Sequence, residues 1–509
     1  MHSYLYLIIS IIFSILFSCL SFARKKSAIQ IVNQMDFGWT LGNSFESYDS
    51  SIKIKTPIEQ ITLWGNEPPK KESFKKLKKY GFKTIRFPVT WMNFMDELGN
   101  VDPKWMTSVK EVVDMIISSD LYCILNVHHD SNSGFWLSEG EKAKKKFIIL
   151  WKQISNEFIL YDEHLVFECM NDVVYDGNYN YSLLLLFNQA FIDTIRNSGG
   201  NNKDRLLIIA GANKELDLTC SKDYLLPNDP SHKFAISIHY FLPIYFTIER
   251  DDDPYFYFDS TGKKVIIEPL TQWGTENNYK EMFTNFETMK EYYVDKGIPI
   301  IITEVGVLTE QKKESESIEE YLFFFFSLSN SYNGISSCLL DKSNKKFGDM
   351  NYYDRKSYKW FDEKIGENFR NIYKKKNINP NEYYFVSNTE TVQYNTPVLS
   401  MNIKIGSKKV LKAIYNVKIL STYTGGVGFG VASVDKNGKW FGITINGKNG
   451  KKEYDGTYTF TIDLSNRDVN NYVEVQKWWG EENIIFNNFS IEYNQTYKFF
   501  DYEAYKNEQ

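Results

Sequence analysis

Short apolar runs recur through the first two thirds of the chain, and most are separated by longer segments with amphipathic helical spacing. Such runs predict buried strands, and a 3.6-residue period predicts helices. The predicted strands span 36–42, 83–88, 121–127, 164–170, 205–210, 234–239, 298–303 and 334–340. Eight strand–helix units over roughly 350 residues predict an α/β fold, a (β/α)8 TIM barrel, which we assign to residues 28–372.

The pattern changes after Trp360. The stretch 373–394 contains a polar, Pro-containing run and predicts a linker. From 395 to 509 short alternating runs separated by turn signals, such as Asn446-Gly447, replace the helical spacing and predict a smaller all-β sandwich domain. The segment 242–275 is too long for a plain connection from strand to helix, so we expect a loop over the barrel mouth.

Residues 1–23 form an apolar run that ends in small residues, a pattern typical of a cleaved signal peptide. Arg24, Lys25 and Lys26 follow the run, whereas no Lys or Arg precedes it. Positive charge on that side also fits an uncleaved anchor at the cell surface. We expect a secreted protein whose mature form has no membrane segment, with the anchored form as the alternative.

Composition narrows the classes of partner. The chain has 509 residues, a net charge of −5, six His and five Cys. The acidic balance argues against nucleic-acid binding, and no Cys or His spacing typical of a metal site occurs. Cys123, Cys169 and Cys338 lie in predicted strands, so we expect them to be buried free thiols. We expect no cofactor, and a monomer.

Polar residues gather where the predicted strands end. Asp172 follows the fourth strand and Glu304 the seventh, while Arg86, His128 and His239 end the second, third and sixth. Barrels of this kind build their sites at the carboxyl ends of the strands. Two acids in that position are what hydrolysis of a glycosidic bond requires.

These residues lie in motifs that resemble those of glycoside hydrolase family 5 endoglucanases. The motifs are 38–45 (GWTLGNSF), 64–66 (WGN), 85–91 (IRFPVTW), 126–130 (NVHHD), 167–171 (FECMN), 237–240 (SIHY), 299–306 (PIIITEVG) and 347–355 (FGDMNYYDR). They come in the family's order and span about residues 28–370. The resemblance implies a TIM barrel that hydrolyses β-linked glucans with retention of configuration.

The resemblance also implies a role for each matching residue. Glu304 would be the nucleophile, and Asp172 would protonate the leaving oxygen and later activate water. The two carboxyl groups of a retaining enzyme lie about 5–5.5 Å apart. Arg86 would keep Glu304 ionised, and Asn171 would bind the sugar 2-hydroxyl. The other implied substrate contacts are His128, His239, Tyr240, Trp39 and Trp64.

Three departures from the family pattern fall in the same predicted pocket. Asp172 stands where the family has Glu, Phe241 where it has a Tyr that contacts the nucleophile, and Leu340 where it has a Trp that stacks on the reacting sugar. A misplacement of about 1 Å can cost roughly a hundredfold in rate, and Asp is shorter than Glu by one methylene. We do not expect Glu168 to substitute, because it lies about 13 Å deeper on the same strand at roughly 3.3 Å per residue.

The sandwich has candidates of its own. Residues 473–480 (VEVQKWWG) and the strand after them resemble the closing strands of bacterial carbohydrate-binding modules. Neighbouring side chains on a strand point to opposite faces, so one Trp of the adjacent pair is a candidate for stacking on sugar rings. We name Trp478 as this candidate, and Trp440 as a second.

These features predict a protein that recognises a β-linked polysaccharide such as cellulose or a related β-glucan. Because the three departures coincide, we expect weak or absent hydrolysis combined with polysaccharide binding. An active retaining endo-β-1,4-glucanase that uses Glu304 and Asp172 is the first alternative. A surface or structural protein without a role in sugar chemistry is the second.

Overall fold

The computed structural model divides into two compact units, residues 1–377 and 378–509. The described residues of the first unit are 25–49, 51–130, 136, 141–171, 173, 180–249, 256–258, 264–266, 270–309, 313–343 and 350–374. Those of the second are 382–384, 388–396, 400–406, 408–419, 428–434, 440–442, 451–452, 457–464, 471–479 and 484–498. The predicted signal peptide and Asp172 lie outside these ranges.

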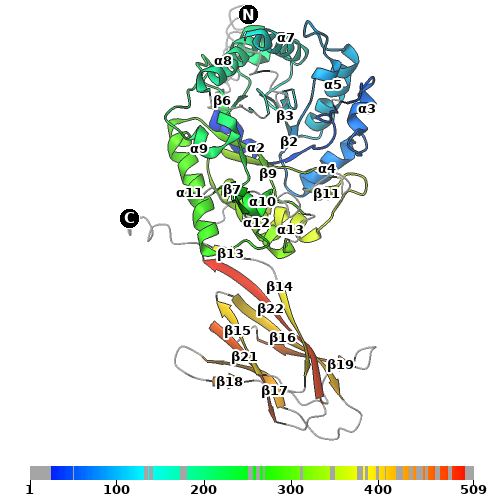
Figure 1. Ribbon diagram of the computed structural model, residues 1–509, viewed down its shortest axis with the longest axis vertical. Coiled ribbons are helices and arrows are strands. Elements are labelled where there is room, and N and C mark those ends of the chain that lie inside the picture. The colour runs from blue at the N-terminus through cyan, green and yellow to red at the C-terminus, as the bar shows by residue number, and fades with distance from the viewer. Residues whose placement is uncertain are drawn as a thin grey trace, which may run out of the picture. The chain divides into compact units, whose positions relative to one another are not determined.

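The first unit contains a closed barrel of parallel strands (Figure 1). The strands are β1 (Phe37–Thr40), β2 (Thr84–Phe87), β3 (Tyr122–Asn126), β4 (Leu165–Glu168), β5 (Leu207–Ala210), β6 (Phe234–Tyr240), β9 (Ile300–Val305) and β10 (Ile335–Leu339). Each coincides with one predicted strand, and the predicted TIM barrel is confirmed. The strands are almost continuously apolar because both faces of a parallel sheet are buried.

Helices surround the barrel (Figure 1). They include α3 (Pro57–Thr62), α4 (Lys71–Lys79), α5 (Pro103–Ile117), α7 (Glu141–Glu157), α8 (Tyr181–Ser198), α9 (Leu216–Thr219), α11 (Glu276–Tyr292), α12 (Ser315–Ser331) and α13 (Glu363–Lys374). Local sequence sets their ends. In α5 the Asp102 side chain accepts a hydrogen bond from the Lys104 N–H, and Pro103 occupies the first turn, where its missing N–H costs nothing.

Helix α2 (Ala28–Met35) packs on the amino end of the barrel. Ser27 and Gln30 form a reciprocal capping box that starts the helix. The apolar face of α2, which includes Ile31 and Val32, is buried in one cluster with residues at the amino ends of strands, among them Val166. This contact leaves the carboxyl ends of the strands for the polar residues.

The segment 242–275 contains more regular structure than the predicted loop. It includes α10 (Ile244–Thr247) and an antiparallel pair, β7 (Phe256–Phe258) and β8 (Lys264–Ile266). Its predicted place over the barrel mouth stays a prediction.

The second unit is an all-β domain of two antiparallel sheets, in agreement with the predicted class. One sheet has the order β13-β22-β16-β20-β19, with β14 also paired to β22, and the other has the order β15-β21-β17-β18. The strands are β13 (Glu382–Tyr384), β14 (Asn388–Thr396), β15 (Ser400–Gly406), β16 (Lys408–Ile419), β17 (Gly428–Val434), β18 (Trp440–Gly442), β19 (Lys451–Lys452), β20 (Tyr458–Asp463), β21 (Asn471–Trp479) and β22 (Ile484–Lys498).

The predicted linker requires a correction. Residues 373–394 include the end of α13, all of β13 and most of β14, and both strands pair with β22. Polar composition does not distinguish a linker from a strand whose backbone is paired on one side. These residues therefore belong largely to the second unit.

Two further observations concern the described part of the chain. Cys123, Cys169 and Cys338 are buried free thiols, as predicted. Within the described ranges, no helix is long and apolar enough to cross a bilayer, and no group of three or more His, Cys, Asp or Glu side chains could hold a metal ion.

Candidate active site

Arg86 is the centre of the polar cluster inside the barrel. Its side chain is fully buried, and its guanidinium contacts three residues from two other strands. Nη1 donates to Glu304 Oε1 at 2.7 Å, Nε donates to Glu168 Oε2 at 2.8 Å, and Nη2 donates to Asn171 Oδ1 at 2.7 Å. A planar fork of donors can hold two carboxylates at fixed angles, which a single ammonium cannot do.

Glu168 is the most completely bonded carboxylate of this network. Oε1 accepts from Arg86 Nη2 at 3.1 Å and from Lys214 Nζ at 3.0 Å, and Oε2 also accepts from Asn126 Nδ2 at 3.3 Å. Burial alone would raise the pKa of Glu168, but the charges of Arg86 and Lys214 lower it to about 2. Glu168 is therefore a permanent anion of the barrel interior.

Glu304 is placed differently. Its side chain is 11% exposed, whereas that of Glu168 is fully buried. One oxygen accepts from Arg86, and the other lies 3.7 Å from His239 Nδ1 on the adjacent strand, where a register shift between Ile238 and His239 aligns the two residues. An anchored carboxylate that still reaches solvent has the geometry of a nucleophile.

The protonation of His128 follows from its neighbours. The Val89 N–H donates to Asn126 Oδ1 at 3.1 Å, which fixes the orientation of that amide. The Asn126 NH2 group then faces His128 Nδ1 at 3.1 Å, so Nδ1 accepts and the ring proton lies on Nε2. Burial, followed by the nearby cationic groups, holds the pKa of His128 well below its usual value. His128 is thus a neutral donor at this site.

Comparisons with known proteins fit this geometry. The model of the family "Cellulase (glycosyl hydrolase family 5)" matches residues 42–346. The chain belongs to glycosyl hydrolase family 5. Among its family 5 relatives, Endoglucanase A of Paenibacillus barcinonensis is 33% identical over 329 residues, 58% of this chain and 76% of that protein. Endoglucanase A of Clostridium longisporum is 30% identical over 332 residues, 60% of each protein.

Solved structures extend the comparison. A GH5-4 broad specificity endoglucanase from an uncultured bovine rumen ciliate is 54% identical, covers 69% of this chain and 98% of its own, and has a TM-score of 0.66. A GH5-4 broad specificity endoglucanase from Ruminococcus champanellensis with bound cellotriose is 26% identical and covers 68% of this chain and 99% of its own, with a TM-score of 0.58. The similarity lies in the family 5 barrel.

The family 5 barrel brings most of the predicted site residues together. Arg86, Asn171, His239 and Glu304 lie within the one network described above, and His128 joins it through Asn126. Asp172 falls outside the described residues, so its predicted pairing with Glu304 stays a prediction.

Two residues predicted to contact substrate are buried, at 0% and 1% exposure. Trp39 is fully buried and donates through Nε1 to Asp341 Oδ2 at 2.8 Å, so its ring supports the barrel wall. Tyr240 is 1% exposed, packs on Phe286 of α11, and its hydroxyl accepts from Asn285 Nδ2 at 2.9 Å. Side chains alternate along a strand, so Tyr240 points away from the barrel interior, unlike His239 before it.

Trp64 remains a candidate for substrate contact. It is partly exposed and forms an aromatic cluster with Tyr48 and His129, with ring centroids 6.1 Å and 5.6 Å away. His129 in turn lies 4.6 Å from the His128 ring. This cluster continues from the network along the β1 and β3 ends of the barrel.

The two other residues that depart from the family pattern follow the strands on either side of Glu304. Phe241 follows β6 and Leu340 follows β10, and these strands are the neighbours of β9. Both side chains are partly exposed, and the Phe241 ring lies 6.2 Å from that of His239. The strands on either side of Glu304 are therefore followed by an apolar ring without a hydroxyl and by an aliphatic side chain.

Sequence reasoning missed Lys214 and the ion pairs of Glu168. Lys214 follows β5, and a lone Lys in a turn gives no signal that it is buried. The depth of Glu168 was estimated along its own strand, but Arg86 reaches from β2 to both carboxylates and connects them directly. Both surprises arise from contacts between strands that are distant in sequence.

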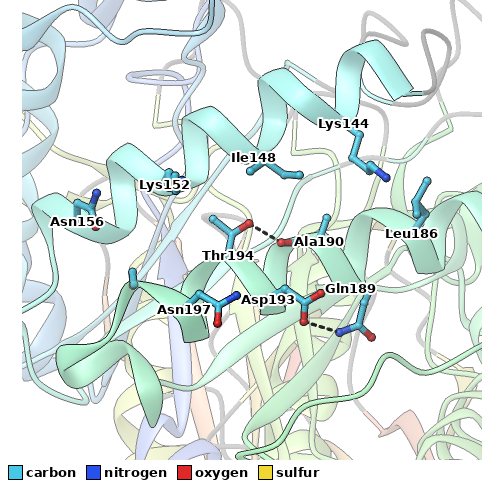
Figure 2. A pocket seen from close by; sticks show the side chains of 11 residues that line it. Lys144, Ile148, Lys152, Asn156, Leu186, Gln189, Ala190, Asp193, Thr194 and Asn197 are labelled. Atoms are coloured by element: carbon cyan, nitrogen blue, oxygen red, sulfur yellow. Dashed lines mark hydrogen bonds between the residues drawn. The ribbon is translucent and has the colours of Figure 1, made fainter.

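A groove on the outside of the barrel is separate from this network. It has a volume of about 630 Å³ and is lined by residues of α7 and α8, among them Lys144, Lys152 and Asp193 (Figure 2). Within it, Gln189 donates to Asp193 and the Thr194 hydroxyl to the Ala190 carbonyl. It shares no residue with the cluster around Arg86.

For Trp440 and Trp478 the structure describes the strands on which they lie. Trp440 begins β18 and Trp478 lies on β21, and both strands belong to the same four-stranded sheet. Their predicted contact with sugars stays a prediction.

Proposed function

We propose that the barrel hydrolyses β-linked glucans with retention of configuration, with Glu304 as the nucleophile and Asp172 as a shortened acid/base. The observation that carries the proposal is the Arg86 fork. It holds Glu304 at 2.7 Å while the Glu304 side chain stays 11% exposed, with His239 beside the second oxygen. Intact support for a nucleophile favours a working catalyst over a barrel that has lost its chemistry.

We further propose that protonation of the leaving group is the slow step. Asp172 stands where the family has Glu, and a carboxyl retracted by one methylene is misplaced by about 1 Å, which can cost roughly a hundredfold. Phe241 and Leu340 add to the loss, because neither supplies the contact of the residue it replaces. The result is a weak hydrolase that retains binding of its substrate.

The substrate class follows from the relatives. The two relatives described above are endoglucanases, and the 54% identical structure is that of an endoglucanase of broad specificity. We therefore propose that the barrel accepts internal bonds of cellulose-like and mixed β-glucans. Secretion through the predicted leader fits substrates of this kind, which lie outside the cell.

A second proposed activity is binding of insoluble polysaccharide by the β domain. It is supported by the separate compact unit and by the presence of Trp440 and Trp478 on strands of one sheet. Exposed aromatic rings on such a sheet would stack on sugar rings.

The test compares leaving groups. Wild-type protein, Asp172→Glu and Glu304→Gln are assayed on 2,4-dinitrophenyl cellobioside, which needs no acid, and on carboxymethyl-cellulose and mixed-linkage β-glucan, which do. We expect the wild type to cleave the activated aryl substrate well and the polymers slowly, and Asp172→Glu to raise polymer turnover on the order of tenfold to a hundredfold. Glu304→Gln should abolish both reactions.

Other outcomes would change the proposal. No turnover of the aryl substrate by the wild type would show that the nucleophile is inactive and leave only polysaccharide binding. Fast turnover of the polymers, unchanged in Asp172→Glu, would show that Asp172 is a competent acid. Absence of both turnover and binding to any β-glucan would favour a non-sugar role.

A further inference from the structure

Lys214 is a buried cation in the barrel interior. It lies at the end of the 3-10 turn Ala212–Lys214, which follows β5 directly. The residue is 1% exposed, and its Nζ donates to Glu168 Oε1 at 3.0 Å and to the Ser237 hydroxyl. Lysine is rarely buried to this extent, because removing an ammonium from water is costly unless an opposite charge meets it.

The backbone supports this placement at a cost of its own. Asn213 and Lys214 are consecutive residues with left-handed φ values of 50° and 56°. Residues other than Gly seldom adopt this region, and Lys less often than Asn. Gly211 allows the tight start of the turn, since a Cβ there would lie 2.5 Å from the Ser237 carbonyl oxygen. Strained backbone that delivers one side chain inward points to a role for that side chain.

Charge balance indicates what the role is. In the described part of the network, the guanidinium of Arg86 contacts two carboxylates, Glu168 and Glu304. With Arg86 alone, two buried carboxylates would share one cation, and the charge of one of them would be uncompensated. Lys214 contacts Glu168 and cancels its charge, which leaves the charge of Arg86 for Glu304.

We propose that Lys214 is a positioning residue for the hydrolytic reaction: it neutralises Glu168 so that the Arg86 guanidinium can hold the Glu304 carboxylate in place. This inference rests on the proposed function and concerns the same site. It assigns Lys214 no contact with the substrate, and its effect passes through Glu168 and Arg86.

Groups on or next to five of the surrounding strands define the expected pH effect. Arg86 comes from β2, His128 from the end of β3, Glu168 and Cys169 from β4, His239 from β6 and Glu304 from β9. Burial, followed by nearby positive charges that include Lys214, holds the pKa values of His128 and His239 well below their usual range. Loss of Lys214 removes positive charge, so the pKa values of Glu168 and both histidines should rise. Protonation of the two histidines at higher pH moves the acid limb of activity upward.

The first experiment measures the pH profile of kcat/KM on 2,4-dinitrophenyl cellobioside. Lys214→Met should move the acid limb upward by about one pH unit, which lowers kcat/KM on the order of tenfold below the limb and less at neutral pH. Lys214→Arg keeps the positive charge, so its acid limb should lie at the same pH as that of the wild type. Lys233→Met is the matched control, because Lys233 is a buried Lys at the amino end of β6, 3.9 Å from Asp204, and its loss should leave the limb unchanged.

A double variant separates charge balance from simple packing. Lys214→Met with Glu168→Gln removes one charge of each sign, so the acid limb should return toward that of the wild type. If Lys214 only filled space, the double variant would lose more kcat/KM than Lys214→Met alone. That result would overturn the proposal. Should Lys214→Met not fold, the double variant and Lys214→Arg still give these opposite expectations.

A measurement without turnover distinguishes this proposal from the proposed function. Carboxyl ¹³C NMR of glutamate-labelled protein, assigned with Glu168→Gln, follows the titration of Glu168. Its midpoint should rise by about one pH unit or more in Lys214→Met. Equal midpoints of the Glu168 titration in the wild type and in Lys214→Met would refute the role of Lys214, even if the enzyme is active. A shifted midpoint in a protein without turnover would support the network while refuting hydrolysis.

Discussion

At the scale of single residues, two side chains decide what the barrel can do. Arg86 is buried with no water to solvate it, so its charge must be met by carboxylates, and Glu168 and Glu304 meet it from two different strands. His128 is buried and neutral because its Nδ1 accepts from Asn126. The network therefore presents one anchored anion and a neutral donor to the open end of the barrel.

Replacement of Arg86 tests the fork. In Arg86→Lys a single ammonium cannot reach both carboxylates and Asn171 at the angles of a guanidinium. We expect kcat on 2,4-dinitrophenyl cellobioside to fall on the order of a hundredfold, since Glu304, the proposed nucleophile, is no longer held in place. The control is Arg205→Lys, because Arg205 is equally buried but donates mainly to main-chain carbonyls, such as that of Leu165. Equal loss of kcat in both variants would contradict the role of Arg86.

Titration of His128 gives a pH dependence of stability. Its folded pKa is lowered, so its contribution to stability is complete above the unfolded pKa of about 6.5 and is lost as pH falls toward the folded value. The free energy of unfolding should therefore fall with acidification below about pH 6.5, by up to about 1.4 kcal/mol per pH unit for this group. Urea unfolding at several pH values should show a shallower slope for His128→Asn. An unchanged slope would show that other groups control acid sensitivity.

At the scale of elements, the barrel separates stability from chemistry. The amino end is packed by the apolar face of α2, whereas the carboxyl ends of the strands hold the charged network. The strained turn after β5 also lies at the carboxyl end of its strand, on the same side as the network. Changes at the two ends should therefore have different consequences.

A core substitution in α2 tests this separation. Ile31 is 1% exposed, so Ile31→Ala should lower the free energy of unfolding by about 2–5 kcal/mol while kcat at 25 °C stays unchanged. Ile58 of α3 is 51% exposed, and Ile58→Ala should change stability by less than about 0.5 kcal/mol. Thermal unfolding and steady-state kinetics measure both effects. A loss of kcat in folded Ile31→Ala would show that the amino end is coupled to the site.

At the scale of the whole molecule, the chain is a family 5 barrel followed by a separate β domain. The barrel has its own closed sheet and core, and the candidate site consists of barrel residues. The β domain builds its two sheets from its own strands, with β22 as the common partner of β13, β14 and β16.

Truncation after Asn377 tests whether the two units act independently. The barrel alone should keep kcat/KM on soluble aryl cellobioside within about twofold, because the described residues of the candidate site all belong to the first unit. Its binding to insoluble cellulose in sedimentation assays should decrease if the β domain binds polysaccharide. Full-length Trp440→Ala and Trp478→Ala proteins provide the comparison. Undiminished sedimentation of the truncated barrel would contradict a binding role for the β domain.

The sequence by itself determined the strands, the barrel and the residues at the strand ends. Strand positions could be predicted because continuous apolar runs are what burial on both faces of a parallel sheet requires. Arg86 and Glu304 could be identified because the ends of parallel strands meet at one rim whatever the details of packing. The resemblance to family 5 added roles to these positions.

Tertiary structure alone decided which side chains face inward and how charges are shared. Trp39 and Tyr240 lie in matching motifs, yet their strand positions bury them in the wall and against helices. No local pattern indicated that Lys214 would be buried against Glu168, since the two residues are 46 positions apart, one in the turn after β5 and the other on β4. Electrostatic pairing depends on distance through space, and that distance is set by closure of the barrel, which no local pattern encodes.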